Sequence, residues 1–337
     1  METEQMIRKL PFIVAVWALL LSCGGGRKAA VSSTAQEPAA PARPAFNADS
    51  AFAFVKAQTD FGPRVPGTPA HRACAAWLAE KLKQFGAETV VQSFQTTTFD
   101  NTVLDCRNII GRINPDSPVR VIICSHWDSR PWADNDPDPG KHKTPVDGAN
   151  DGASGVGVIL EIARQFQLKA PQIGVDCIFL DAEDWGPGPD FKGRHLSEYW
   201  GLGTQYWARN AFKAGYKARY AVLLDMVGGQ GARFSQETYS VMYARNTVDK
   251  VWNAGAQLGY GSLFVPENGA FVTDDHYFIN TIARIPAIDI VPYLPGLEDS
   301  SFGPTWHTSQ DDIAHIDRRI LGAVGETLLY VLYNEKQ

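Results

Sequence analysis

The sequence has few cysteines and no block of basic residues, and both absences exclude classes of protein. Only five cysteines occur among 337 residues, and none forms a CxxC pair, so a zinc knuckle or a thioredoxin-like motif is not expected. The 31 Lys and Arg residues are outnumbered by 37 Asp and Glu, which gives a net charge of −6. Because nucleic-acid-binding domains gather basic residues on one surface, we expect no nucleic-acid partner.

No hydrophobic run is long enough to cross a membrane comfortably. The longest one, residues 10–21, follows Arg8 and Lys9 and has the length of a signal-peptide core. It ends in "LLSC", which resembles the lipobox of bacterial lipoproteins, whose cysteine is lipidated after cleavage; a plain secretory signal is the alternative. Because Gly24 rather than Asp follows Cys23, the resemblance implies a lipid anchor in the cell envelope, in the outer membrane facing the periplasm.

The composition of the chain changes twice along its length. Residues 1–23 are predicted to be the lipoprotein signal peptide, and residues 24–46 are rich in Ala, Pro, Gly and Ser, as in a flexible tether. Residues 47–337 show no linker and no repeat, so we expect one folded domain. The cysteines of this domain are Cys74, Cys106, Cys124 and Cys177. The last three lie in or beside apolar runs and should be buried. The spacing of the four does not say whether any of them pair in disulfides.

Short apolar runs alternate with helical patterns after residue 70. Strands are predicted at residues 107–113, 119–128, 175–184, 220–227 and 285–291. Helices are predicted at residues 70–86, 154–166, 201–212, 246–259 and 318–333. Continuously apolar strands that alternate with helices indicate an α/β fold with a mostly parallel sheet covered on both faces.

Acidic residues and imidazoles come at the ends of three of the predicted strands. His126 and Asp128 follow the apolar run 119–124, Glu183 and Asp184 follow the run 175–180, and Asp225 comes after the run 220–224. Ligands of open α/β sheets collect beyond the carboxyl ends of the strands, so these side chains should meet at one edge.

Nitrogen and carboxylate oxygen are the ligands that zinc prefers, and a catalytic zinc keeps one position open. A first zinc could be held by Asp151, Asp184 and His307, and a second by His126 and Asp225 with Asp151 as a bridge. Other roles suit the remaining acids. Glu183 is placed to be a general base, and Asp128 could bond the His126 imidazole. Taken singly, Asp225 could be structural and Asp151 a helix N-cap.

The order of these motifs resembles the zinc-aminopeptidase superfamily. Its members run H-x-D, a Gly-rich loop with a bridging Asp, an acidic pair, an Asp and a final His. "CSHWDSRP", "DGANDGASG", "LDAEDWG", "LLDMVGG" and "TWHTSQDD" follow that order, and residues 60–82 are also similar to the N-terminal part of the family. The resemblance covers residues 50–333 and implies a single α/β domain with a mixed, mostly parallel central sheet flanked by helices.

Within this superfamily the chain looks most like the glutaminyl cyclases. In "FVTDDHYF", Asp274 stands where aminopeptidases usually have Ser, and Trp306 precedes His307 in the "WHT" form typical of cyclases. One departure is the pair Glu183-Asp184, which is Glu-Glu in the animal enzymes. The resemblance implies a zinc-dependent glutaminyl-peptide cyclotransferase. Such an enzyme converts the N-terminal glutamine of peptides and proteins to pyroglutamate by intramolecular aminolysis and releases ammonia.

The resemblance also implies roles for individual residues. Glu183, Asp225 and Asp274 would be catalytic, one Zn²⁺ would be held by Asp151, Asp184 and His307, and Trp306 would wall the substrate pocket. The alternative is a di-zinc aminopeptidase that hydrolyses N-terminal residues, and a third possibility is a lipoprotein that only binds peptides. The loop at residues 130–145 could either rim the pocket or lie on the surface.

Overall fold

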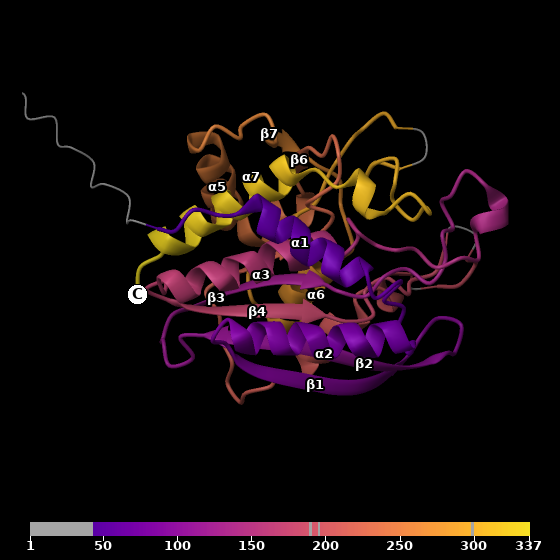
Figure 1. Cartoon of the computed structure of the whole chain (residues 1–337), viewed down its shortest axis with the longest axis horizontal. Helices are drawn as coiled ribbons and strands as arrows, with labels where there is room; N and C mark the ends of the chain where they lie inside the picture. The colour runs from indigo at the N-terminus through magenta and orange to yellow at the C-terminus, as the bar shows by residue number, and fades with distance from the viewer. Residues whose placement is uncertain (1–42, 189–190, 195, 298–299) are drawn as a thin grey trace, which may run out of the picture. The chain divides into compact units, whose positions relative to one another are not determined.

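The computed structural model describes residues 43–188, 191–194, 196–297 and 300–337. The predicted signal peptide, Cys23 and nearly all of the predicted tether lie outside these residues. The described residues form one compact unit (Figure 1). Its main helices are α1 (Ala48–Thr59), α2 (Pro69–Gln84), α3 (Ala153–Leu168), α4 (Leu202–Arg209), α5 (Thr238–Gln257), α6 (Asp275–Phe278) and α7 (Arg318–Asn334).

Six strands form the central sheet in the order β1-β2-β4-β3-β5-β8. They are β1 (Glu88–Thr97), β2 (Val103–Ile113), β3 (Arg120–His126), β4 (Gly174–Leu180), β5 (Ala221–Leu224) and β8 (Ala287–Ile290). The pairs β1–β2 and β2–β4 are antiparallel, and the other three pairs are parallel. The prediction of a mixed, mostly parallel sheet is confirmed. A separate small sheet joins β6 (Phe234–Gln236) and β7 (Phe264–Asn268).

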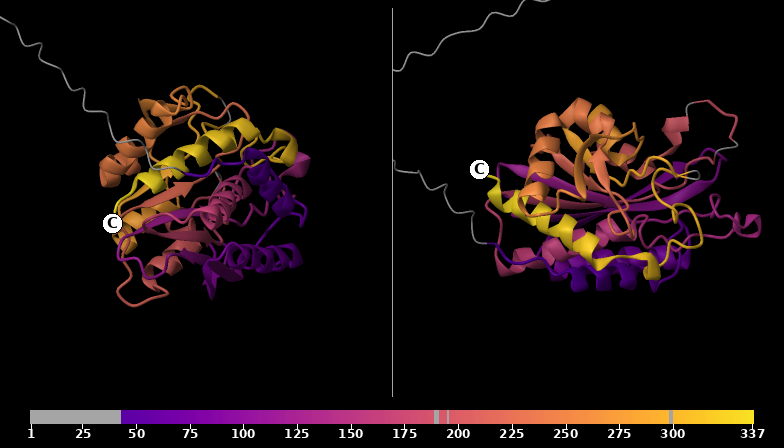
Figure 2. Two further views of the ribbon diagram at one scale, coloured as in Figure 1. Left: turned by 60° about the vertical axis from the view of Figure 1, so that its left-hand side comes forward. Right: turned by 90° about the horizontal axis from the view of Figure 1, so that it is seen from above.

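Both faces of the central sheet are covered by helices, as Figure 2 shows. Ile123 and Cys177 point into a core shared with α1, α2, α3 and α7, whereas their neighbours Ile122 and Ile178 point into a second core that includes Trp207 of α4. Each of these side chains is at most 2% exposed. Burying one large apolar side chain stabilises a fold by roughly 1.5–3 kcal/mol. This two-sided burial is why the strands are apolar throughout rather than alternating.

The predicted strands occur, but three of them end earlier than predicted. The run at 119–128 ends at His126, that at 175–184 at Leu180, and that at 220–227 at Leu224. Beyond two of these ends the backbone enters the left-handed region, with φ of 53° at Ala182 and 52° at Met226. A residue in this conformation cannot continue a strand. The polar residues after the ends of β4 and β5 therefore lie in loops at the sheet edge.

α5 spans Thr238–Gln257, but its backbone is non-helical at Ala244 (φ −142°, ψ 39°), so the helix predicted at 246–259 is the part after this kink and an unpredicted part begins at Thr238. Its N-cap is Glu237, whose carboxylate accepts the backbone N–H groups of Tyr239 at 2.8 Å and Ser240 at 2.6 Å. The sequence analysis missed this start because Ser, Thr, Asp and Asn are the usual N-cap residues. No helix among the described residues is long and apolar enough to cross a membrane. The four cysteines of the domain are buried and free of disulfides.

Candidate metal centre and active site

The parallel strands deliver the predicted site residues to one edge of the sheet. β3 ends at His126, Asp225 directly follows the last residue of β5, and Asp184 lies four residues past β4. Asp151 comes just before α3, and His307 lies in the loop that precedes α7. In Figure 1 this edge is on the right, opposite the C-terminus. Five residues between positions 126 and 307 of the sequence therefore meet in one place.

Asp151, Asp184 and His307 form one compact, buried group of donor atoms. His307 Nε2 lies 3.2 Å from Asp184 Oδ1 and 3.8 Å from Asp151 Oδ2, and one atom from each residue lies within 4.8 Å of the others. Asp184 Oδ2 has no hydrogen-bond partner among the described residues. Zinc bonds to nitrogen and carboxylate oxygen are about 2.0–2.2 Å long. One imidazole and two carboxylates at this spacing, with a buried oxygen left unpaired, fit a single zinc ion.

His126, Asp151 and Asp225 form a second group, which is tighter than the first. His126 Nε2 lies 2.9 Å from Asp151 Oδ1 and 3.2 Å from Asp225 Oδ1, which are ordinary hydrogen-bond lengths. Burial alone would lower the pKa of His126, but the nearby carboxylates of Asp128, Asp151 and Asp225 raise it well above the usual value. Gly152 is needed beside it, because a Cβ there would lie 2.5 Å from His126 Nε2. The N-cap of α3 is this glycine, so the N-cap alternative for Asp151 is wrong.

Glu183 faces the same pocket and belongs to a buried cluster of acids. Burial, together with repulsion from Asp274, raises the pKa of Glu183 well above its usual value. Burial also raises the pKa of Asp225 to about 7, with His126 opposing the rise and Asp274 adding to it. The pKa of Asp274 is raised by burial as well. So many carboxyl groups cannot all ionise cheaply in one buried place, and the cluster therefore retains protons near neutral pH.

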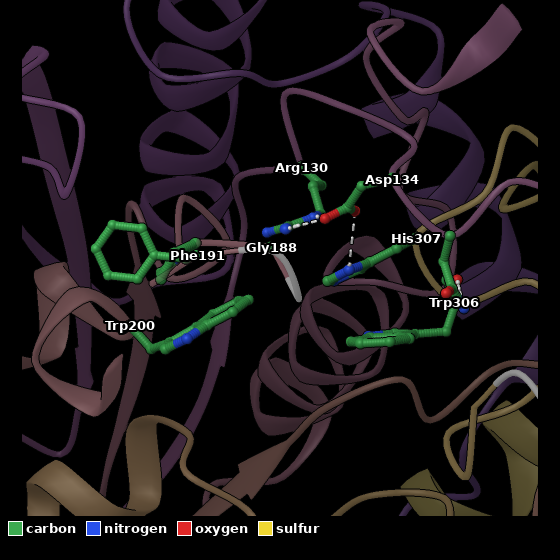
Figure 3. Close-up of a pocket in the computed structure, with 9 residues that line it drawn as sticks. Arg130, Asp134, Gly188, Phe191, Trp200, Trp306 and His307 are labelled. Carbon is green, nitrogen blue, oxygen red and sulfur yellow. Dashed lines mark hydrogen bonds and ion pairs between the residues drawn. The ribbon is translucent and has the colours of Figure 1, made fainter. Parts of the chain in front are cut away.

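The pocket in front of these acids has aromatic walls. It is a cavity of about 260 Å³ lined by Glu183, Asp274, Phe271, Trp306 and other residues. The Trp306 ring stacks on the His307 imidazole, with 3.7 Å between ring centroids. A neighbouring cavity of about 250 Å³ shares Trp306 and His307 and is shown in Figure 3. Trp306 thus lines the pocket, where the sequence analysis expected it.

Two acids hold the backbone of the ligand loops. Asp128 accepts the N–H groups of Glu183 at 3.1 Å and Asp184 at 3.2 Å. Its Oδ1 also lies 3.5 Å from His126 Nδ1, so the two groups are close as predicted, but His126 Nδ1 forms no hydrogen bond with any described residue. Asp311 accepts the N–H groups of Asn150 at 2.7 Å and Asp151 at 3.1 Å. The sequence analysis missed Asp311, although it lies four residues after His307 in the quoted motif.

The first half of the loop at 130–145 borders the site. Arg130, Asp134 and Asn135 line the second cavity, whereas residues 143–145 are exposed. The alternative that this loop rims the pocket therefore holds for its first half. Sequence reasoning assigned no role to Arg130 or Asp134.

Comparison with known proteins now places the chain in a family. Residues 108–332 match the model of peptidase family M28. The chain belongs to this family.

Several solved structures are similar to this M28 chain. The glutaminyl cyclase of Bacteroides thetaiotaomicron, bound to N-acetylhistamine, is 51% identical, with a TM-score of 0.85 over 88% of this chain and 100% of that one. A leucine aminopeptidase precursor from the same organism is also 51% identical, with a TM-score of 0.84 over 88% of this chain and 99% of that one. Among curated proteins, the glutaminyl-peptide cyclotransferase of Drosophila melanogaster is 26% identical over 76% of this chain and 72% of its own length.

Proposed function

We propose that this M28 chain is a glutaminyl-peptide cyclotransferase, which converts the N-terminal glutamine of peptides and proteins to pyroglutamate and releases ammonia. The observation that carries the proposal is Asp274, a buried acid that lines the pocket together with the general-base candidate Glu183. The Bacteroides thetaiotaomicron glutaminyl cyclase, 51% identical, and the Drosophila melanogaster glutaminyl-peptide cyclotransferase, 26% identical, support it.

The donor atoms of Asp151, Asp184 and His307 suit one zinc ion, as argued above. Zinc bound there would polarise the γ-carbonyl of glutamine and stabilise the negative charge that develops on its oxygen. For His126 we propose a hydrogen-bonding role, because its Nε2 already lies 2.9 Å from Asp151 Oδ1 and 3.2 Å from Asp225 Oδ1. We therefore expect one zinc per chain.

Glu183 moves the proton that the reaction requires. The α-amine nitrogen of the substrate attacks its own γ-carboxamide carbon, the ring C–N bond forms, and the bond to the amide nitrogen breaks. Glu183 accepts a proton from the attacking amine and donates it to the departing nitrogen, which leaves as ammonia. No water is consumed. Because nucleophile and electrophile belong to one molecule, the pocket only has to hold a folded conformation of the glutamine side chain.

The aromatic walls select that conformation. Trp306, Phe271 and Phe302 line the pocket and offer apolar surface to the methylene groups of the glutamine side chain. Asp225 and Asp274 line the same pocket as Glu183, and we propose that these acids exchange protons with it during the reaction.

A di-zinc aminopeptidase is the second candidate. It is favoured by the second donor group, His126, Asp151 and Asp225, and by the similarity to the leucine aminopeptidase precursor. In that reaction Glu183 would deprotonate a water molecule that attacks a peptide carbonyl. The two candidates differ in their products, so a single assay separates them.

The deciding experiment offers two fluorogenic amides, one of glutamine and one of leucine. We expect the purified chain to release ammonia and form the pyroglutamyl amide from the glutamine substrate, and to leave the leucine substrate intact. Mass spectrometry detects the loss of ammonia, and fluorescence detects hydrolysis of the amide. Free glutamine or free leucine among the products would contradict the cyclotransferase proposal.

Metal content provides the control for this assay. A chelator should abolish ammonia release, and zinc should restore it. Elemental analysis of the restored protein is expected to give one zinc per chain, whereas two would support the peptidase.

We also propose that the chain is anchored by lipid at Cys23, on the outer membrane facing the periplasm. The support is the lipobox-like "LLSC" and the tether-like composition that follows it. The full chain expressed in a bacterial host should partition into the detergent phase, and Cys23→Ala should move it to the aqueous phase. Equal partitioning of both proteins would contradict the anchor.

A further inference from the structure

The loop after β3 carries a buried ion pair that no proposed step uses. The Arg130 guanidinium, 1% exposed, faces the Asp134 carboxylate with two nitrogen–oxygen distances, 2.7 Å from Nε to Oδ1 and 2.6 Å from Nη2 to Oδ2. Two parallel bonds of this kind fix the relative orientation of both groups.

The third nitrogen of Arg130 reaches the ligand Asp184. Nη1 donates to Asp184 Oδ1 at 3.2 Å, to the Asp184 carbonyl oxygen at 3.1 Å and to the Gly186 carbonyl oxygen at 3.2 Å. One guanidinium therefore holds both the side chain and the backbone of Asp184. The carboxylate oxygen left without a partner, Oδ2, stays available for a metal ion.

Asp134 contacts the imidazole of the ligand His307. Its Oδ1 lies 3.4 Å from His307 Nδ1, the ring nitrogen that does not face the other metal ligands, as the dashed line in Figure 3 marks. The backbone N–H of Asn135 donates to the His307 carbonyl oxygen at 3.1 Å. A carboxylate on Nδ1 keeps the proton on that nitrogen and leaves the lone pair of Nε2 free to bind metal.

The same guanidinium also packs against the aromatic wall. Its carbon atom Cζ lies 5.1 Å from the centroid of the Trp132 ring and 5.2 Å from that of the Trp200 ring. Trp200 lines both cavities next to the metal centre. Arg130 therefore connects the metal ligands to the pocket wall.

We propose that Arg130 and Asp134 are positioning residues that hold two of the three zinc ligands, Asp184 and His307, in binding geometry before zinc arrives. The role needs the planar fork of arginine, because a lysine ammonium cannot bond Asp134 twice and Asp184 at once. The inference rests on the zinc site of the proposed function. It concerns metal retention, so it holds for either the cyclotransferase or the peptidase.

The test compares Arg130→Lys and Asp134→Asn with a matched control, Arg120→Lys. Arg120 forms a similar two-point ion pair with the fully buried Asp176 at the opposite end of β3. Zinc dissociation constants are measured on the full chain by competition with a chromogenic chelator, and melting temperatures are measured without metal. Loss of a partner that orients a metal ligand weakens metal binding by about 10–100-fold. We expect that loss in both site variants, and wild-type zinc affinity with a lower melting temperature in the control.

Turnover at saturating zinc gives a second readout, since a positioning role predicts recovery of most of the lost activity there. Wild-type zinc affinity in Asp134→Asn, which preserves the shape of the side chain, would overturn the proposal even if Arg130→Lys fails to fold. An equal loss of affinity in Arg120→Lys would also overturn it, because the effect would then be general destabilisation. A chain that binds zinc tightly but forms no pyroglutamate would contradict the proposed function and leave this inference standing.

Discussion

Replacing Glu183 with glutamine is expected to lower kcat for glutamine cyclisation by about 10²–10⁴-fold, the range that a general acid–base group contributes. The carboxamide has nearly the same size, but it cannot take a proton from the attacking amine and pass it to the leaving nitrogen. KM should change little, because the side chain is not needed to hold the substrate. Steady-state ammonia release from a Gln-initiated peptide measures the effect.

A matched control for this variant is Glu161→Gln. Glu161 is a fully buried carboxylate in α3 that pairs with Arg164 and accepts the N–H of Asn47 at 3.1 Å, so it lies outside the pocket. Its loss should lower the melting temperature and leave kcat unchanged. Zinc content must be measured in both variants, since Glu183 directly precedes a ligand. A zinc-loaded Glu183→Gln protein with wild-type kcat would show that another group carries the proton.

The fold was predictable where burial is two-sided. β3, β4 and β5 are buried along their whole length, so they read as uninterrupted apolar runs whose ends could be placed within a few residues. β1 was missed because it is an edge strand whose sequence, ETVVQSFQTT, is mostly polar and half exposed. β6 and β7 have only three and five residues, too few to show a period.

The site was predictable where a ligand directly follows a recognisable element. Asp225 comes after β5, and the order of the motifs supplied Asp151 and His307. The residues that hold these ligands were not predictable in the same way. Arg130 reaches Asp184 across 54 positions and Asp311 reaches Asp151 across 160. Such contacts depend on how loops meet in the folded chain, and no local spacing in the sequence signals them.

Replacing Asp274 with serine is expected to reduce cyclisation by about 10²-fold, the lower end of the contribution of a proton-handling group. Asp274 also caps α6, since its side chain accepts the backbone N–H of Asp275. Serine and asparagine cap helices about as well as aspartate, so Asp274→Ser and Asp274→Asn remove the acid and keep the cap. The cyclisation rate of both variants should fall to the same extent, and their melting temperatures should change little. Asp274→Ala should lose the cap as well, which lowers the free energy of unfolding by about 1 kcal/mol.

The pH dependence identifies the cause of this loss. Burial raises the pKa of Glu183, and repulsion from Asp274 raises it further. Without that repulsion the pKa of Glu183 falls, so its basic form persists to lower pH. The acid limb of log kcat/KM should therefore move to lower pH while the plateau drops. Full turnover in Asp274→Ser would contradict the proton-sharing role. It would also show that the acid at this position, where peptidases usually have serine, does not distinguish cyclisation from hydrolysis.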